Sequence, residues 1–165
     1  MFLVRSEETI PCPCCQGHLV VVGSRRRGVI KSSGESIQLI IRRLRCEDCR
    51  RIHHELPNLL VPYKRYQAEC IESVVTKAEH CVATDESTLH RWKIWFKDWA
   101  KYASGCLNAI ASRFELPVKV SSRPLHPSLQ SIGRWVGNAD GWLARTVRPI
   151  ANENLWIHTR SAFLS

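Results

Sequence analysis

The chain has 165 residues, of which 44% are hydrophobic. This composition indicates a globular protein of one domain or two small ones rather than a disordered tail. Its longest apolar runs, residues 19–22 and 59–61, are far shorter than the roughly 20 residues of a membrane-spanning helix. Residues 1–10 show no apolar segment followed by a cleavage site, so no secretory signal is expected. We therefore expect a cytoplasmic protein with no membrane partner.

The formal net charge is +9, and the charge is unevenly distributed. Residues 1–64 carry 11 Lys/Arg against 6 Asp/Glu, residues 65–115 carry 7 of each, and residues 116–165 carry 6 against 2. A basic surface most often serves to bind a polyanion, and nucleic acid is the commonest one. An inert basic surface is the alternative interpretation.

The first motif in chain order is a pair of cysteines, and a second pair follows later in the sequence. Cys12/Cys15 and Cys46/Cys49 form two Cys-x-x-Cys pairs, which together supply the four thiolates of a closed tetrahedral zinc site. Eight cysteines in a chain without a signal peptide favour metal binding over disulfides. The alternative interpretation is that these are ordinary buried cysteines that bind no metal. We predict a structural Zn²⁺ ion bound by Cys12, Cys15, Cys46 and Cys49.

Three other side chains near these pairs could also be ligands. Cys14 could replace Cys12 or Cys15, but that would leave a less favourable Cys-x-Cys or Cys-Cys spacing. His53 and His54 follow the second pair, and imidazole also suits zinc. The simpler interpretation is a strand or surface role for both histidines.

The segment between the cysteine pairs indicates a β-hairpin or three-stranded zinc ribbon. Residues 18–22 and 28–31 have the composition of strands, with a break at Gly23-Ser24, and residues 32–35 have turn chemistry. Residues 36–44 form a third predicted strand that leads to Cys46. The prolines Pro57 and Pro62 then mark a hinge. The basic side chains in the ribbon are Arg25, Arg26, Arg27, Arg42, Arg43 and Arg45.

Two helices are predicted after the hinge, the first over residues 66–80. The second starts near Glu86, beyond the capping oxygens of residues 84–87, and continues past Lys101, with a possible end or bend at Ser104-Gly105. One stripe of this helix is apolar and is expected in the core: Leu89, Trp92, Trp95, Phe96, Trp99, Ala103, Cys106, Leu107 and Ile110. The opposite stripe carries His90, Lys93, Lys97 and Lys101. It is either a solvated face or the reading face of a helix-turn-helix.

The last third of the chain has no recognisable motif. Residues 117–131 are rich in Pro and Ser and indicate a linker, and a short helix is expected over residues 142–148. Tryptophans in this segment imply that it packs on another part of the protein. The predicted fold is α+β. A zinc ribbon occupies residues 1–62, a helix-turn-helix-like unit residues 63–115, and a linker plus a C-terminal segment of unknown role residues 116–165.

We expect no enzymatic activity. The sequence lacks the G-x-x-x-x-G-K-[ST], G-x-G-x-x-G, G-x-S-x-G and H-E-x-x-H motifs. Its only aspartates, Asp48, Asp85, Asp98 and Asp140, do not form a credible metal-binding triad for phosphodiester cleavage. A zinc site with four protein ligands also leaves no position for a catalytic water.

Residues 11–66 contain the run CPCC…VVGSRRRGVI…GESIQLIIRRLRCEDCRRIHHELPNLLVPYKRY. This run resembles the N-terminal zinc ribbon of bacterial insertion-sequence transposases, and also short bacterial proteins of unknown function that carry the ribbon alone. The resemblance is looser over residues 67–101 and does not extend to residues 116–165. It implies a zinc role for Cys12, Cys15, Cys46 and Cys49, and contacts to the DNA backbone by Arg25, Arg26, Arg27, Arg42, Arg43 and Arg45. The chain departs from the transposases by ending before any catalytic domain, so the resemblance implies their DNA-binding half alone.

The function expected from these observations is binding of double-stranded DNA by a transposase-derived, transposon-associated or regulatory protein. Zinc folds the ribbon, its arginines hold phosphates, and the start of the long helix enters the major groove with His90, Arg91, Lys93 and Lys97. Two alternatives remain open. One is a protein-interaction adaptor that uses an exposed tryptophan patch. The other is a single-stranded RNA binder in which Arg and Trp stack on bases.

Overall fold

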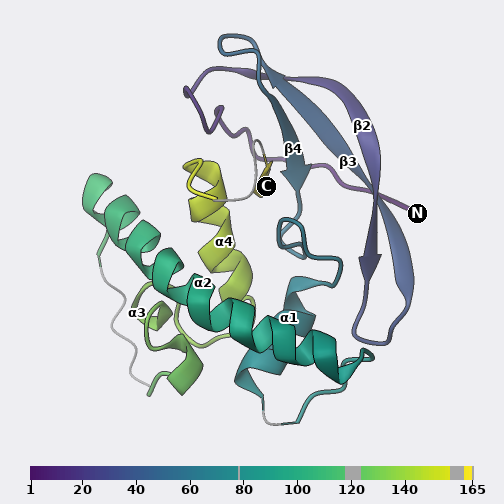
Figure 1. The fold of residues 1–165 in the computed structure, drawn as a ribbon. Coiled ribbons are helices and arrows are strands. Elements are labelled where there is room, and N and C mark those ends of the chain that lie inside the picture. Colours follow the sequence, from purple (N-terminus) through teal and green to yellow (C-terminus); the bar gives the residue numbers. More distant parts are fainter. Residues whose placement is uncertain (78, 118–123, 157–161, 165) are drawn as a thin grey trace.

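The computed structural model describes residues 1–77, 79–117, 124–156 and 162–164. A mixed sheet lies on one side of the molecule and the main helices lie on the other (Figure 1). The predicted α+β class is confirmed. The strands are β1 (Phe2–Leu3), β2 (Leu19–Ile30), β3 (Ser36–Cys46), β4 (Ile52–Leu56) and β5 (Ala162–Leu164). The helices are α1 (Ala68–Thr76), α2 (Glu86–Arg113), α3 (Gly133–Val136) and α4 (Trp142–Asn152), with a 3-10 turn, η1, at Pro127–Leu129.

Strand β3 organises the sheet. The long strand β2 pairs antiparallel with it from Leu19↔Cys46 to Ile30↔Ser36. Along its other edge, β3 pairs with β1 in parallel and with β4 antiparallel, and β4 pairs in parallel with β5. The two predicted strands of residues 18–31 are one strand. Between Val21 and Gly23 the register shifts. A glycine can accommodate such a β-bulge, so the strand continues past it.

Helix α1 is shorter than predicted and ends at Thr76. Lys77 adopts an extended conformation, with φ −109° and ψ 135°, and the backbone N–H of Ala83 donates a hydrogen bond to Ser32 O on the hairpin turn. The connection to α2 therefore spans residues 77–85. It is longer than the three or four residues that typically join the helices of a helix-turn-helix.

Helix α2 begins where the capping signal predicts. The Asp85 side chain accepts a hydrogen bond from the backbone N–H of Thr88 at 2.8 Å, as an N-cap does. The helix then continues without a break through Gly105 to Arg113. Glycine disfavours a helix by about 1 kcal/mol, but the neighbouring Ala103 and Cys106 are buried in the core. Tertiary contacts thus override the local preference for an end or a bend.

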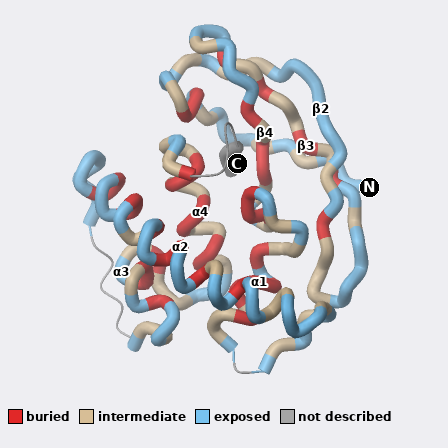
Figure 2. The backbone as a smooth tube through the Cα atoms, viewed as in Figure 1, coloured by how far each residue is buried: buried red, intermediate tan, exposed pale blue. Residues whose placement is uncertain are grey.

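One hydrophobic core joins the sheet to the helices, and the buried segments of both are marked in Figure 2. It includes Leu39 and Ile41 of β3 as well as residues of α1, α2 and α4. The predicted apolar stripe of α2 faces this core: Trp92, Phe96, Trp99, Ala103, Cys106, Leu107 and Ile110 are buried, and Leu89 and Trp95 pack against it. Trp142 of α4 is 1% exposed and meets Phe96 edge-on, with 5.0 Å between ring centroids. The core therefore runs across both predicted boundaries, near residues 62 and 115.

Candidate metal centre and basic hairpin

The two predicted cysteine pairs meet at one end of the β2–β3 hairpin. Cys12 Sγ lies 3.6 Å from Cys49 Sγ, and Cys15 Sγ lies 3.4 Å from Cys46 Sγ. All four sulfurs lie within 4.8 Å of one another. The pairing of Leu19 with Cys46 aligns the strand that follows the first pair with the strand that leads into the second. The hairpin therefore closes the distance between two pairs that are far apart in the sequence.

Each cysteine pair sits in a turn of the same geometry. The backbone N–H of Cys12 donates to Gly17 O at 2.9 Å, and that of Cys46 donates to Arg51 O at 3.0 Å. In each turn the residue before this acceptor has a positive φ, 66° at Gln16 and 62° at Arg50. Two separate segments thus repeat one backbone arrangement, which presents the sulfurs of both pairs to a common centre.

Gly17 allows the two turns to approach each other, a role that the sequence pattern did not reveal. A Cβ atom at this position would lie 2.0 Å from Asp48 Oδ2 and 3.1 Å from Cys46 Sγ. The exposed Asp48 side chain could rotate away, but the buried Cys46 sulfur is fixed by its place in the cluster. A glycine at this position therefore avoids a tight contact beside the sulfur cluster.

The crowded sulfurs differ widely in acidity. Burial raises the pKa of the Cys12 thiol to about 12. Burial also opposes ionisation of Cys46, but hydrogen bonds from the backbone at Cys49 and from Cys15 lower its pKa to about 7. Neighbouring thiolates repel one another, so a bound cation is needed for all four to be ionised together. Four sulfur donors in this arrangement could hold a metal ion.

Cys14 and His53 border this cluster. His53 is fully buried, and its Nε2 lies 3.3 Å from Cys12 Sγ. Cys12, Cys14 and His53 form a second group whose potential ligand atoms lie within 4.8 Å of one another. Arg51 Nη1 donates a hydrogen bond to Cys14 Sγ at 3.2 Å. Of the two histidines considered as ligands, only His53 belongs to such a group in the described residues, because His54 follows it on a strand and faces the opposite side of the sheet.

The hairpin strands carry the basic residues that the sequence singled out. β2 and β3 together contain six arginines and no aspartate or glutamate. Directly paired residues of antiparallel strands point to the same face. Arg25 pairs with Ile41 and Arg27 with Leu39, whereas Arg26 pairs with Ile40. The run of three arginines is therefore divided between the two faces of the hairpin.

On the face that carries Ile41, the basic groups gather around His54. Its pKa is lowered, first by burial and then by the positive charges of Arg25, Arg43 and Arg27. Arg27 also donates to Val61 O at 3.4 Å and Lys64 O at 3.0 Å, so it holds the loop that follows β4. The resulting cluster is electropositive, which favours an anionic partner.

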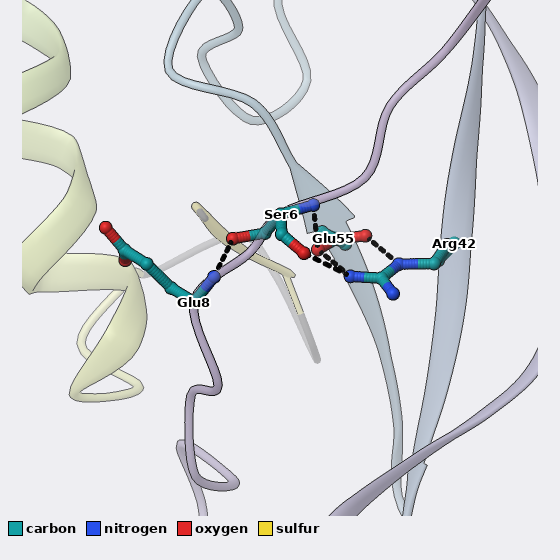
Figure 3. Close-up of polar contacts among 4 residues, drawn as sticks. All are labelled: Ser6, Glu8, Arg42 and Glu55. Carbon is teal, nitrogen blue, oxygen red and sulfur yellow. Dashed lines mark hydrogen bonds and ion pairs between the residues drawn. The ribbon is translucent and has the colours of Figure 1, made fainter.

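Arg42 is committed to a contact within the protein. Its guanidinium forms an ion pair with Glu55, whose side chain is 2% exposed (Figure 3). The same carboxylate accepts a hydrogen bond from the backbone N–H of Ser6 at 3.1 Å, and Arg42 Nη2 donates to Ser6 O at 3.3 Å. This differs from the predicted role in phosphate binding, because the guanidinium that was expected to face DNA instead ties the N-terminal segment to the sheet.

The remaining predicted DNA contacts occupy different environments. Arg25 and Arg26 are exposed, and Arg43 and Arg45 are half-buried. Among the described residues, no acidic side chain pairs with any of these four arginines. Arg45 Nε is buried without a hydrogen-bond acceptor in this part of the chain. Arg25, Arg26 and Arg43 therefore remain as candidates for contacts with a polyanion.

On α2, the predicted basic residues do not share one surface. His90, Lys93 and Lys97 are exposed and, at 100° per residue, lie on one stripe. Arg91 lies on a different side, where its Nε donates to Ser87 O and its Nη2 donates to Thr88 Oγ1. Arg91 therefore contacts the first turn of its own helix. It does not share a surface with Lys93.

Comparisons with known proteins give one match. Residues 12–92, just under half of the chain, match a family described as Domain of unknown function (DUF6431). No curated protein and no solved structure matches the chain, and the predicted resemblance to transposases has no counterpart among these results. Within the described residues, no helix has the length and apolar character to cross a bilayer. The matched region contains both cysteine pairs and the hairpin between them, and it is similar to a family whose function is unknown.

Proposed function

We propose that this chain is a zinc-dependent DNA-binding protein, derived from a transposase or serving as a transposon-associated regulator. The observation that carries the proposal is the pair of matched cysteine turns at the end of a hairpin whose two strands contain six arginines and no acidic residue. A metal ion would fix the hairpin, and the arginines would bind the phosphate backbone of double-stranded DNA.

The donor set suits zinc. Cys12, Cys15, Cys46 and Cys49 offer four sulfurs, which is the ligand set of structural zinc sites and also of iron–sulfur clusters. Zinc fits the small ribbon better, because such units depend on the metal for folding and need no electron-transfer partner. With all ligands supplied by the protein, the ion would stabilise structure and would leave no open position for a reacting water.

The phosphate contacts in this proposal belong to Arg25 and Arg43, on the face of the hairpin that carries Ile41, and to Arg26, on the opposite face of β2. A guanidinium binds phosphate through paired N–H donors, and none of these three has an acidic partner in the described residues. Their contribution is to affinity, since contacts to phosphate carry no base sequence. The affinity should therefore fall steeply with salt, because each neutralised phosphate releases a counterion.

Base reading by α2 receives less support than the hairpin contacts. Residues 77–85 form a long connection between α1 and α2, and Lys93 and Lys97 line a groove together with Lys77. A helix that enters the major groove needs its reading face to protrude. We therefore place the principal DNA contacts on the hairpin.

The adaptor and RNA alternatives both relied on accessible tryptophans. Trp92, Trp99, Trp142 and Trp156 are instead buried in the core, where they serve neither as a docking patch nor as a stacking platform. Trp95 is partly buried and stacks on Trp99, with 5.2 Å between ring centroids. Double-stranded DNA is thus the preferred polyanion.

The decisive experiment measures binding of random-sequence duplex DNA by fluorescence anisotropy over a series of salt concentrations. The triple variant Arg25→Ala/Arg26→Ala/Arg43→Ala should weaken binding and reduce the slope of log Kd against log salt by about three. Lys31→Ala is the matched control, because Lys31 lies on the same hairpin but pairs with Glu35 at 2.8 Å. Equal slopes for the triple variant and the wild type would contradict the proposal, as would preferential binding of single-stranded RNA.

A further inference from the structure

A groove between α1, α2 and the segment around η1 lies outside the sulfur cluster and the arginine hairpin. We propose that it binds a nucleoside polyphosphate, with the phosphates held by four lysines and the nucleoside placed against an apolar floor. This inference does not depend on the proposed DNA binding. The volume of the groove is about 690 Å³, which lies within the range of small-molecule sites, roughly 300–1,000 Å³.

The charge of the groove favours an anion. Lys77 directly follows α1, and Lys93, Lys97 and Lys101 come from successive turns of α2. Among the described residues that line the groove, no aspartate or glutamate offsets these charges. Like charges spaced by four residues on a helix repel each other. A bound polyphosphate would relieve that repulsion along the whole row.

The floor of the groove is apolar and already ordered. The half-buried Val75 and the exposed Pro127 supply its accessible apolar surface, and the other apolar lining residues, Val74, Phe96 and Ala100, are each at least 96% buried in the core. An apolar floor below a charged rim suits a ligand with two parts, one ring system and one anionic group. Inorganic phosphate alone would satisfy the lysines and leave the apolar surface of Val75 and Pro127 uncovered, so the geometry points to a phosphorylated organic molecule.

The wall opposite α2 supplies polar groups. His126, Ser128 and Gln130 line this side, and the Ser128 backbone N–H donates to His126 Nδ1 at 3.2 Å. A neutral imidazole that accepts at Nδ1 carries its proton on Nε2. His126 can therefore donate a hydrogen bond to a phosphate oxygen or a ribose hydroxyl without being charged.

A nucleoside polyphosphate fits this groove better than duplex DNA does. A duplex presents its phosphates along a convex surface, which contacts ridges and broad basic faces and does not fill an apolar recess. The arginine hairpin is such a face, whereas the lysine groove is a recess between α1, α2 and residues 126–131. Two chemically different phosphate sites on one chain would be independently testable.

The test is isothermal titration of the full chain with ATP in magnesium-free buffer, with adenosine and inorganic triphosphate as comparison ligands. We expect saturable binding of ATP, weaker binding of triphosphate, and no binding of adenosine at the same concentrations. Lys93→Gln/Lys97→Gln should raise the Kd for ATP by about tenfold or more. These lysines are exposed, so the variant should fold normally, and circular dichroism checks that it does.

Matched variants separate this site from the DNA surface. Arg25→Ala/Arg26→Ala should bind ATP with the wild-type Kd, and Lys93→Gln/Lys97→Gln should keep most of the affinity for duplex DNA. The inference is overturned if ATP shows no binding at millimolar concentration or if the lysine variant binds ATP normally. It is also overturned if triphosphate binds as tightly as ATP, or if duplex DNA displaces ATP and the lysine variant loses DNA binding.

Discussion

The carboxylate of Glu72 in α1 accepts a hydrogen bond of 2.7 Å from the backbone N–H of Leu143 in the first turn of α4. Its second oxygen accepts from the N–H of Gly141 at 2.9 Å. Gly141 is the N-cap residue of α4 and has no side chain with which to cap it. An acidic side chain from a distant helix thus neutralises the free donors at this helix end.

The first prediction concerns this distant cap. Glu72→Ala should lower the free energy of unfolding by about 2–4 kcal/mol, because the buried N–H of Leu143 and the part-buried N–H of Gly141 lose their acceptor. Urea unfolding followed by tryptophan fluorescence measures the change. Glu69→Ala is the matched control, since Glu69 lies on the same helix but is exposed, and should change stability little. Equal losses for the two variants would show that the hydrogen bonds from Gly141 and Leu143 to Glu72 contribute little to stability.

The second prediction distinguishes the metal ligands from their neighbour. Cys15→Ser should abolish stoichiometric zinc, whereas Cys14→Ser should retain it, because only Cys15 belongs to the four-sulfur group. Zinc content is measured on purified protein with a colorimetric chelator. A loss of zinc from Cys14→Ser with retention in Cys15→Ser would instead assign the metal to the group of Cys12, Cys14 and His53.

The third prediction tests the close approach of the two cysteine turns. Gly17→Ala should weaken zinc binding on the order of tenfold, because its Cβ would lie 3.1 Å from Cys46 Sγ. The double variant Gly17→Ala/Asp48→Ala should not recover wild-type affinity, since removing the Asp48 carboxylate leaves the sulfur contact in place. Competition with a chelator of known affinity measures both. Full recovery in the double variant would mean that the clash with Asp48 was the whole effect.

Sequence reasoning succeeded where the structure depends on residues close together in the chain. The Cys-x-x-Cys spacing predicted the sulfur cluster, and the oxygens of residues 84–87 predicted the start of α2, where Asp85 is the cap. The 3.6-residue period predicted which face of α2 is buried, from Trp92 to Ile110. Each of these inferences needs only local geometry.

The failures concern contacts between distant segments. Arg42 looked like a free cation because nothing in its own strand indicates Glu55 on the next one. The division of Arg25 and Arg26 between two faces was available from the two-residue period of a strand, but only once residues 19–30 were treated as one strand. The continuation of α2 through Gly105 depends on burial of Ala103 and Cys106, which local propensity does not contain.

The last prediction uses the lowered pKa of His54. Burial first, and then the charges of Arg25, Arg43 and Arg27, lower this pKa below its ordinary value of 6.5. The unfolded chain therefore takes up a proton at a higher pH than the folded protein does. The contribution of His54 to stability is fully present above pH 6.5 and is lost as the pH falls toward the folded-state pKa.

His54→Gln should unfold with a weaker dependence on pH between neutral and mildly acidic conditions than the wild type. Urea titrations at matched pH values measure both proteins, and the difference between them removes the contribution of His53. Parallel curves would show that the three arginines do not disfavour a positive charge at His54, and would argue against the electropositive face on which the proposed DNA contacts depend.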